Sequence, residues 1–275
     1  MIQLSVIIPH YNSPMTLEIL LQSIPNRSEI EVLVIDDSSD RDIDYYNNCK
    51  EKFEGRNITF YKNTIESKGA GKARNLGLRH ARGRWLLFAD ADDFFVKDFW
   101  NTVNQYLNDE ADIIYFSPTS VKIGTEISSD RHEHYKKLVK DYCLNGNHEN
   151  ELRLRYTYWS PCSKMIRRKL VNDNQIWFDG TLHSNDMLFS TKVGYYAHKI
   201  KAVDKVIYCI TESESSLTAQ KTEKALAIRK EVFVSYYFFM QKRLSKVDMK
   251  ILGYGLKDFI YFSMYKIKGA FIKNR

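Results

Sequence analysis

The stretch LLFADADDFF, residues 86–95, ends an apolar run with three acids, Asp90, Asp92 and Asp93. The apolar run, residues 86–88, has the composition of a buried strand. Carboxylates this close to one another repel and favour water or a cation. The stretch therefore predicts a strand whose carboxyl end faces a positively charged partner.

Apolar runs of strand length alternate with helical patterns over the first 118 residues. Ser13 and Pro14 indicate where the first helix begins, as its N-cap and its first residue. Alternating strands and helices favour an α/β fold with a mainly parallel sheet flanked by helices. We expect strands at 4–9, 31–37, 58–62, 84–90 and 112–118, and helices at 14–24, 40–53, 71–81 and 97–108.

The alternation ends after residue 118. Residues 119–160 are polar and give no assignment, whereas 163–171 and 186–198 have helical patterns. Residues 205–211 have the pattern of a strand. The sequence thus predicts an α/β domain of the nucleotide-binding type followed by a C-terminal elaboration.

The composition is that of a globular protein, because 275 residues with 44% hydrophobic side chains suffice for one large core or a core with an added lobe. The N-terminus lacks the pattern of a signal peptide, and no segment has the roughly 18 apolar residues of a membrane span. The four cysteines share no metal-binding spacing, which favours a reduced, cytoplasmic setting. These cysteines are Cys49, Cys143, Cys162 and Cys209.

The net charge of +7 is concentrated at the C-terminal end. Residues 242–275 contain nine Lys or Arg and two Asp, so this segment carries the whole excess and the rest of the chain is neutral. A nucleic-acid-binding protein is expected to spread basic groups over a groove. The distribution therefore speaks against a nucleic-acid partner.

Polar motifs follow three of the predicted strands: PHYN (9–12), DDSS (36–39) and DADD (90–93). Each alone is typical of a turn or a helix cap. In open parallel sheets, however, ligands bind beyond the carboxyl ends of the strands, where these motifs meet. Asp90 and Asp92 are spaced to converge on Mg²⁺ or Mn²⁺, directly or through water, which leaves coordination sites for phosphate oxygens.

The glycine-containing stretch SKGAGKARNLG, residues 67–77, matches neither common phosphate-binding motif. Lys72 is followed by Ala73 rather than Ser or Thr, and Arg74 stands where a dinucleotide fingerprint needs its third glycine. What remains is a helix N-terminus with Lys72 and Arg74 in its first turn, which favours an anion. The alternative is a solvated basic face.

Four motifs, in the order in which they occur along the chain, resemble those of the family 2 glycosyltransferases of the GT-A fold. The resemblance is close over residues 3–118 and looser over 159–218. That family transfers a sugar from a nucleotide diphosphate donor to an acceptor hydroxyl, with inversion at the anomeric carbon. The motifs are SVIIPHYN (5–12), EVLVIDDSSD (31–40), GAGKARNLGLRHARGRWLLFADADD (69–93) and SNDMLF (184–189).

The resemblance implies roles for particular residues. Asp90 and Asp92 would hold Mn²⁺ or Mg²⁺, with Asp92 in direct contact, and Asp186 falls where the family has its catalytic base. Pro9 and Tyr11 would line the base pocket. The full set of implied donor-binding residues is Pro9, Tyr11, Asp36, Asp37, Lys72, Arg74, Asn75, Asp90 and Ala91, in which Asp37 or its neighbour Asp36 would accept a hydrogen bond from a uracil-type edge.

The chain departs from the family pattern at Asn185, because the family usually has Glu-Asp where this chain has Asn185-Asp186. Asn185 cannot supply charge on the acceptor or donor side. Asp186 also has a structural interpretation, as a capping acid at a helix N-terminus.

Several further features are open to two interpretations. Trp159, within the acceptor-side segment 156–170, is suited to stack on a sugar ring, but it is equally a candidate for the core, as is Trp177. The stretch ESESSLT (212–218) resembles a Ser-rich segment near the phosphates. His132 and His134 form a weak metal-site candidate and are expected to be solvated.

The chemistry of sugar transfer requires these groups. Displacement of a nucleoside diphosphate builds negative charge on the leaving oxygens, which a cation stabilises. The acceptor hydroxyl is a poor nucleophile until a carboxylate takes its proton. One base opposite the leaving group gives inversion.

The C-terminal stretch 255–275 predicts an amphipathic helix with one apolar face and flanking lysines. Such a helix lies in a membrane interface, with its lysines directed toward anionic headgroups. The alternative is a helix docked on its own domain, with Tyr265 and the lysines facing solvent. The concentrated charge favours an anionic membrane surface, contacted by residues 251–275. The apolar face comprises Leu256, Ile260, Met264, Ile267 and Phe271.

We therefore predict a metal-dependent, inverting glycosyltransferase that uses a UDP-sugar and extends a cell-surface polysaccharide or its lipid-linked precursor, peripheral to the inner face of the cell membrane. Residues 1–118 would form the nucleotide-sugar-binding subdomain, 119–218 the acceptor-side subdomain and 219–275 the basic helical region. The sugar, the linkage and the oligomeric state are left open.

Two other functions are weaker. A sugar-1-phosphate nucleotidyltransferase should have a basic glycine-rich loop after its first strand, where this chain has PHYNSPMT (9–16). A non-catalytic scaffold on the same fold is disfavoured because Asp90, Asp92 and Asp186 are all present.

Overall fold

The computed structural model describes residues 1–64, 69–213 and 221–273, with only the backbone for 266–273. Within these residues the strands form one eight-stranded sheet in the order β3-β2-β1-β4-β7-β6-β8-β5. The strands are β1 (Leu4–His10), β2 (Ile30–Asp36), β3 (Ile58–Lys62), β4 (Trp85–Phe88), β5 (Phe94–Phe95), β6 (Ile113–Lys122), β7 (Lys164–Arg167) and β8 (Ile200–Glu212).

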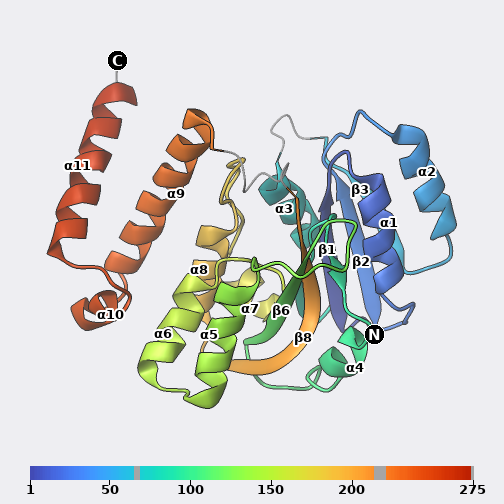
Figure 1. Cartoon of the computed structure of the whole chain (residues 1–275), viewed down its shortest axis with the longest axis horizontal. Helices are drawn as coiled ribbons and strands as arrows, with labels where there is room; N and C mark the ends of the chain where they lie inside the picture. The colour runs from blue at the N-terminus through green and yellow to red at the C-terminus, as the bar shows by residue number, and fades with distance from the viewer. Residues whose placement is uncertain (65–68, 214–220, 274–275) are drawn as a thin grey trace.

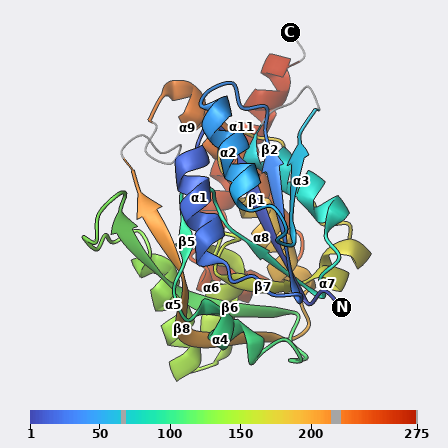
Figure 2. The same cartoon turned by 90° about the vertical axis from the view of Figure 1, so that its right-hand side faces the viewer.

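Helices cover both faces of the sheet. In Figure 1, α1 and α2 lie on one side of β1 and β2, and α3 lies on the other. Figure 2 shows α1 and α2 in front of these strands. The helices are α1 (Pro14–Ser23), α2 (Ile43–Lys52), α3 (Ala70–His80), α4 (Phe99–Asn104), α5 (Glu133–Leu144), α6 (His148–Thr157), α7 (Arg168–Asp173), α8 (Met187–Tyr196), α9 (Glu223–Gln241), α10 (Lys246–Ile251) and α11 (Leu256–Lys273).

The N-terminal half of the sheet is parallel, as predicted. β1 pairs in parallel with β2 and β4, and β2 pairs in parallel with β3. All seven residues of β1 and of β2 are buried, which explains their continuous apolar sequences, since both faces are covered by helices. His10 lies opposite Asp36 in the register, so the polar motifs after β1, β2 and β4 meet at one edge.

The C-terminal half of the sheet departs from the prediction. Residues 163–171, predicted as a helix, form strand β7 followed by α7. β7 runs antiparallel between β4 and β6, and its Met165 and Ile166 are buried. Pairing on both sides overrides the local helical pattern, which is a tertiary effect that short apolar runs do not reveal.

The structure also defines element boundaries that the sequence did not predict or predicted only in part. The unassigned segment 119–160 holds the end of β6 together with α5 and α6, and the predicted subdomain boundary at residue 118 falls inside β6. Pro14 begins α1 as predicted, but the Ser13 side chain makes no capping hydrogen bond. The Ser13 N–H instead donates to His10 Nε2 at 3.3 Å, which ties the start of α1 to the end of β1.

A second apolar core joins α6 and α8 to the C-terminal helices α9, α10 and α11. Phe262 of α11 is buried, with its ring 4.6 Å from that of Tyr237 on α9. Leu256, Ile260 and Met264 point away from this core and are 75%, 49% and 55% exposed. The predicted helix therefore docks on the domain through one face and exposes the predicted apolar stripe, while the side chains of Ile267 and Phe271 lie outside the described residues. Within the described residues, no helix has both the length and the apolar character that crossing a membrane requires.

Candidate active site

The turn between β4 and β5 is fixed through Asp93 by strand β8, which pairs with β5. The Tyr208 hydroxyl donates to Asp93 Oδ2 at 2.8 Å, and the Thr211 N–H donates to Asp93 Oδ1 at 2.7 Å. The Asp90 N–H donates to the same Tyr208 oxygen at 2.8 Å, and Thr211 Oγ1 donates to the Asp92 carbonyl at 2.6 Å. Burial, reinforced by the charges of Asp92 and Asp90, raises the pKa of Asp93 well above its ordinary value. Asp93 thus serves as the inward anchor of the acidic turn.

Arg74 of α3 links the acidic turn to the segment before α8. Its Nη2 contacts Asp90 Oδ1 at 2.5 Å, and its Nη1 donates to Asn185 Oδ1 at 2.8 Å. Burial opposes the charge of Arg74, but Asp90 and then Asp186 favour it, so the pKa of Arg74 lies above its ordinary value. One buried guanidinium therefore brings together predicted donor-side and catalytic residues.

Asp92 is the carboxylate of the turn that remains for a ligand. Within the described residues no side chain of another residue pairs with the Asp92 carboxylate, whereas Asp90 is paired with Arg74. Burial and then the negative charge of Asp90 raise the pKa of Asp92. A divalent cation relieves such a strained carboxylate, and oxygen donors suit Mg²⁺ and Mn²⁺, so the residues fit the predicted metal.

The protein supplies few ligands for that cation. No group of three or more His, Cys, Asp or Glu residues arranged to hold a metal occurs in the described ranges. The remaining ligands would have to be phosphate oxygens and water, as expected for a cation that is bound together with a diphosphate.

Asp186 stands at the N-cap position of α8, but its side chain makes no capping hydrogen bond. The structural interpretation of Asp186 as a capping acid is therefore wrong. Burial raises the pKa of Asp186, while Arg74 and Lys164 act in the opposite direction. The carboxylate is half-buried beside cationic groups, which suits a proton acceptor more than a surface cap.

Asn185 and Asn75 support the loop between α7 and α8. Asn185 accepts from Arg74 and donates to the Thr181 carbonyl at 3.3 Å. Asn75 Nδ2 donates to the Phe178 carbonyl at 2.9 Å, and its Oδ1 accepts from the Phe178 N–H at 2.8 Å. Both polar atoms of the Asn75 side chain are thus hydrogen-bonded to the Phe178 backbone. Because Asn185 is neutral, Asp90 is the ion-pair partner of Arg74.

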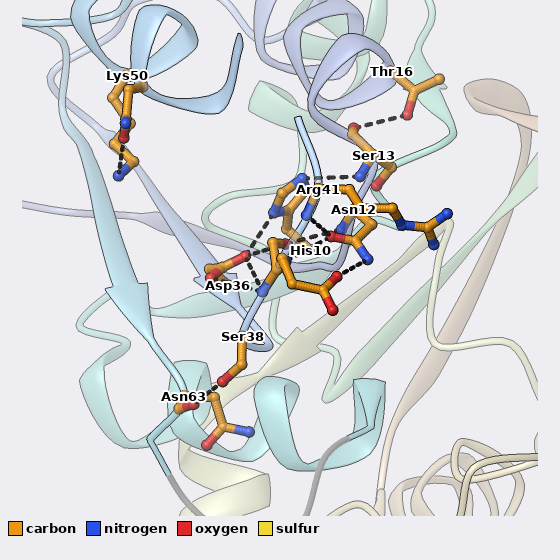
Figure 3. Close-up of polar contacts among 12 residues, drawn as sticks. His10, Asn12, Ser13, Thr16, Asp36, Ser38, Arg41, Lys50 and Asn63 are labelled. Atoms are coloured by element: carbon orange, nitrogen blue, oxygen red, sulfur yellow. Dashed lines mark hydrogen bonds and ion pairs between the residues drawn. The ribbon is translucent and has the colours of Figure 1, made fainter. Parts of the chain in front are cut away.

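Asp36 joins the loops that follow β1 and β2 (Figure 3). His10 Nδ1 lies 3.1 Å from Asp36 Oδ1, and Ser39 Oγ donates to that oxygen at 2.5 Å. Burial acts to raise the pKa of Asp36, but the hydrogen bonds from His10 and Ser39 outweigh it, and the pKa lies below the ordinary value. Asn12 completes the link, since its Oδ1 accepts from the Asp40 and Arg41 N–H groups at 2.9 and 3.1 Å.

Asp37 points toward β3 and α3 instead. Its carboxylate accepts from Asn63 Nδ2 at 2.7 Å and from the Gly69 N–H, just before α3, at 2.5 Å. Of the two candidates for contact with a base, Asp37 is thus the one connected to the entrance of α3. Pro9 is buried at the end of β1, Tyr11 beyond it is 46% exposed, and Ala91 is buried within the acidic turn.

The glycines around Lys72 allow α3 to pack closely against the loop before α8. A Cβ at Gly71 would lie 2.2 Å from the Asp179 carbonyl oxygen, and a Cβ at Gly180 would lie 2.5 Å from Lys72 Cε. The half-buried Lys72 therefore lies across Gly180. This explains the glycine-containing sequence by close packing and speaks against the alternative of a solvated basic face.

The remaining predicted residues have mixed outcomes. Trp159 packs on the second core, 5.6 Å from the Tyr236 ring, and also lines a surface pocket. Trp177 is 37% exposed, so its assignment to the core is wrong. His132 is buried with Nδ1 2.7 Å from Ser120 Oγ, contrary to the expected solvation. Most of the Ser-rich stretch 212–218 lies outside the described residues.

Sequence reasoning missed four residues of this site. Tyr208 and Thr211 lie in a run that indicated only a buried strand, and Lys164 lay in the segment mistaken for a helix. Arg131 donates to the Thr211 carbonyl at 2.9 Å, and its charge opposes the raised pKa of Asp92. Nothing in the spacing of these residues marks them, because they reach the site through strand pairing distant in sequence.

The sequence of the chain is similar to those of known proteins. The family model described as Glycosyl transferase family 2 matches residues 5–174. Poly(ribitol-phosphate) beta-N-acetylglucosaminyltransferase TarS of Staphylococcus aureus is 29% identical over 222 residues, 78% of this chain and 36% of TarS. Glycosyltransferase GlyA of Streptococcus pneumoniae is 27% identical over 234 residues, 81% of this chain and 32% of GlyA. The chain thus spans about a third of the length of either relative.

Solved structures share the architecture. The crystal structure of residues 1–349 of S. aureus TarS in complex with UDP-GlcNAc has a TM-score of 0.69 at 25% identity, over 91% of this chain and 70% of that one. Mannosyltransferase PcManGT from Pyrobaculum calidifontis, in complex with GDP-Man and Mn²⁺, has a TM-score of 0.62 at 18% identity, over 90% and 67%. The predicted GT-A fold is confirmed.

Proposed function

Because the chain belongs to glycosyl transferase family 2, we propose that it is a metal-dependent, inverting glycosyltransferase with a UDP-sugar donor. The observation that carries the proposal is the position of Arg74, which contacts Asp90 on the donor side and Asn185 next to Asp186. The UDP-GlcNAc complex of TarS supports a UDP-sugar.

In this proposal each group of the site has one task. Asp92, assisted by Asp90, would hold Mn²⁺ or Mg²⁺, and the bound ion would stabilise the charge that develops on the leaving diphosphate. Arg74, which is paired with Asp90, adds positive charge at the same place. Asp186 takes the proton of the acceptor hydroxyl during attack.

The donor nucleotide binds in the first subdomain, residues 1–118, above the ends of β1 and β2. Pro9 and Tyr11 flank the base, and Asp37, tied to the entrance of α3, contacts its edge. Lys72, Asn75 and Ala91 shape the diphosphate side of the pocket. Residues 119–218 contribute Trp159, Asn185 and Asp186 to the acceptor side, and 219–275 form the basic helical region.

The acceptor is a hydroxyl of a glycan or a lipid-linked glycan in cell-surface polysaccharide synthesis. The names of the relatives TarS and GlyA agree with a bacterial glycan context. The exposed stripe of α11 and the basic residues 242–275 suit the inner, anionic face of the cell membrane.

The two alternative functions have less support than the glycosyltransferase. Membership of family 2 rules against the sugar-1-phosphate nucleotidyltransferase. A non-catalytic scaffold would have no need of an Asp92 carboxylate that is half-buried and, in the described structure, paired with no other side chain.

A panel of nucleotide sugars with Mn²⁺ tests the proposal, with release of the nucleoside diphosphate as the readout. We expect one UDP-sugar to be turned over, and Asp186→Asn to reduce the rate by about 100-fold or more. Asp173→Asn, on the exposed end of α7, is the matched control. No turnover of any donor, or equal rates for both variants, would contradict the proposal.

A further inference from the structure

A surface pocket of about 530 Å³ lies beside Asp186, between the start of α8 and the C-terminal helices. Ser184 and Met187, which flank Asp186 in sequence, line one wall, and the Met187 N–H donates to the Ser184 carbonyl at 3.3 Å. Trp159 lines the pocket as well. The opposite wall comes from α9 and α11, which lie beyond the segment 5–174 that the family model matches.

The aromatic side of the pocket is rigid. Trp159 Nε1 donates to the Tyr156 carbonyl at 2.8 Å, which fixes the plane of the indole. The rings of Phe233 and Tyr236 lie edge-on to it at 6.4 and 5.6 Å. A fixed aromatic wall suits a ligand with an apolar face, such as a sugar ring or a hydrocarbon chain.

Basic side chains contribute to the pocket wall. Among the described residues, the lining contains Arg229 and Lys230 and no carboxylate. Lys230 Nζ lies 4.4 Å from the Tyr265 ring centre and 5.2 Å from that of Tyr261, so aromatic rings of α11 hold the ammonium group at this place. Two adjacent cations beside aromatic side chains match an amphiphile that carries a phosphate.

We propose that this pocket is the acceptor subsite and that it binds the phosphate end of a lipid-linked saccharide. The inference rests on the proposed function, since it takes Asp186 as the base. Arg229 and Lys230 bind the phosphate, and Trp159 contacts the first sugar, next to the catalytic base Asp186. The donor lies on the other side of the contact between Arg74 and Asp90.

The lipid source follows from the position of α11. This helix contributes Tyr261 to the pocket and exposes Leu256, Ile260 and Met264 on its outer surface. An acceptor whose hydrocarbon chain stays in a membrane can therefore present its phosphate to the pocket while the exposed stripe contacts the same membrane. A water-soluble phosphorylated glycan would give this stripe no role.

Binding of three small probes tests the pocket without knowledge of the natural acceptor. Titrations of the full chain would use decyl phosphate below its micelle concentration, decyl maltoside and inorganic phosphate, followed by calorimetry. We expect decyl phosphate to bind about tenfold or more tightly than either other probe, because only it offers both the apolar chain and the anion. Equal binding of decyl maltoside, or of inorganic phosphate alone, would overturn the lipid-phosphate assignment.

The double variant Arg229→Gln/Lys230→Gln should weaken decyl phosphate binding about tenfold or more, whereas Lys224→Gln, on an exposed part of α9, should leave it unchanged. Unchanged binding to the double variant would overturn the proposal, as would displacement of decyl phosphate by UDP. Release of UDP from a nucleotide sugar without acceptor is measured on the unsubstituted chain and on Lys224→Gln, and should be the same for both. That release reports on the proposed function, so failure of the function and failure of the subsite are distinguishable.

Discussion

Three adjacent aspartates have three different environments. Asp93 is turned inward by Tyr208 and Thr211, Asp90 pairs with Arg74, and Asp92 has no side-chain partner in the described part of the chain. The repulsion that the sequence suggested is thus relieved residue by residue. The buried anchor holds the turn, and the Asp92 carboxylate is the one that pairs with no other side chain in the described residues.

Tyr208→Phe tests the anchor, because it removes the oxygen that accepts from the Asp90 N–H and donates to Asp93. We expect a loss of stability of about 1–3 kcal/mol and a reduced affinity for Mn²⁺ in the presence of UDP, since buried polar groups lose their partner. Chemical denaturation and calorimetry measure the two effects. Tyr45→Phe, at an exposed hydroxyl that donates to Glu18, is the control. A Tyr208→Phe variant with wild-type metal affinity would show that the anchor does not position Asp92.

The pH dependence of activity tests Asp186 as the base. Burial raises the pKa of Asp186, and a base works only when deprotonated. Activity should therefore be lost, as the pH falls, at a higher pH than that of an ordinary aspartate, about 3.9. The pH profile of kcat at saturating Mn²⁺ checks this. The assignment would be contradicted if kcat were lost near the ordinary aspartate pKa and if this pH were the same in Asp186→Glu as in the wild type.

At the residue scale, the sequence predicted that Asp90 and Arg74 lie close together, which the structure shows, while their roles stay predictions. Asp90, Asp92 and Arg74 follow strand ends or begin a helix, and such positions are visible in a single sequence. Tyr208 and Arg131 reach the site only through the pairing of β8 and the packing around it, so no local pattern could show them.

At the scale of elements, β7 is the instructive error. Its Lys164 is buried between the rings of Tyr158 and Tyr115, at 4.5 and 5.3 Å from their centres, and donates to the Tyr158 carbonyl at 2.5 Å. Because charged side chains are rarely buried, a lysine among apolar residues favoured the prediction of an amphipathic helix. The parallel strands were predictable because their apolar runs are uninterrupted.

Lys164→Met tests this buried lysine through stability. Burial lowers the pKa of Lys164 to about 7, so above that pH the unfolded chain binds more protons here than the folded chain does. Stability should therefore rise by about 2 kcal/mol from about pH 7 to about pH 8.5 through this group, and the variant should lack that rise. Urea denaturation at both pH values, with Lys169→Met on the exposed face of α7 as the control, measures it. The same pH dependence in Lys164→Met and wild type would rule this out.

At the scale of the whole molecule, the described residues form two apolar cores. The larger core lies around the sheet, and the second core joins α9 and α11 to α6 and α8 (Figure 1). The charge imbalance of the C-terminal end was visible in the sequence. The docking of α11 through Phe262 was not, because the sequence shows which residues share a face and does not show which face finds a partner.

The exposed stripe of α11 predicts binding to anionic membranes. The triple variant Leu256→Gln/Ile260→Gln/Met264→Gln removes the stripe and keeps the buried Phe262. We expect at least about a tenfold loss of binding to vesicles that contain phosphatidylglycerol, measured by cosedimentation. Ile127→Gln, an exposed apolar residue distant in sequence, is the control. Equal binding of the triple variant and wild type would refute the membrane contact.

The most direct test asks whether Asp92 holds a cation only together with a diphosphate. Electron paramagnetic resonance of free Mn²⁺ reports this, because the sharp signal of the aqueous ion broadens when the ion binds protein. The account predicts that the signal falls when wild-type protein and UDP are both present, and that Asp92→Asn restores it. A signal that is unchanged by UDP and protein, or that falls equally with Asp92→Asn, would contradict it.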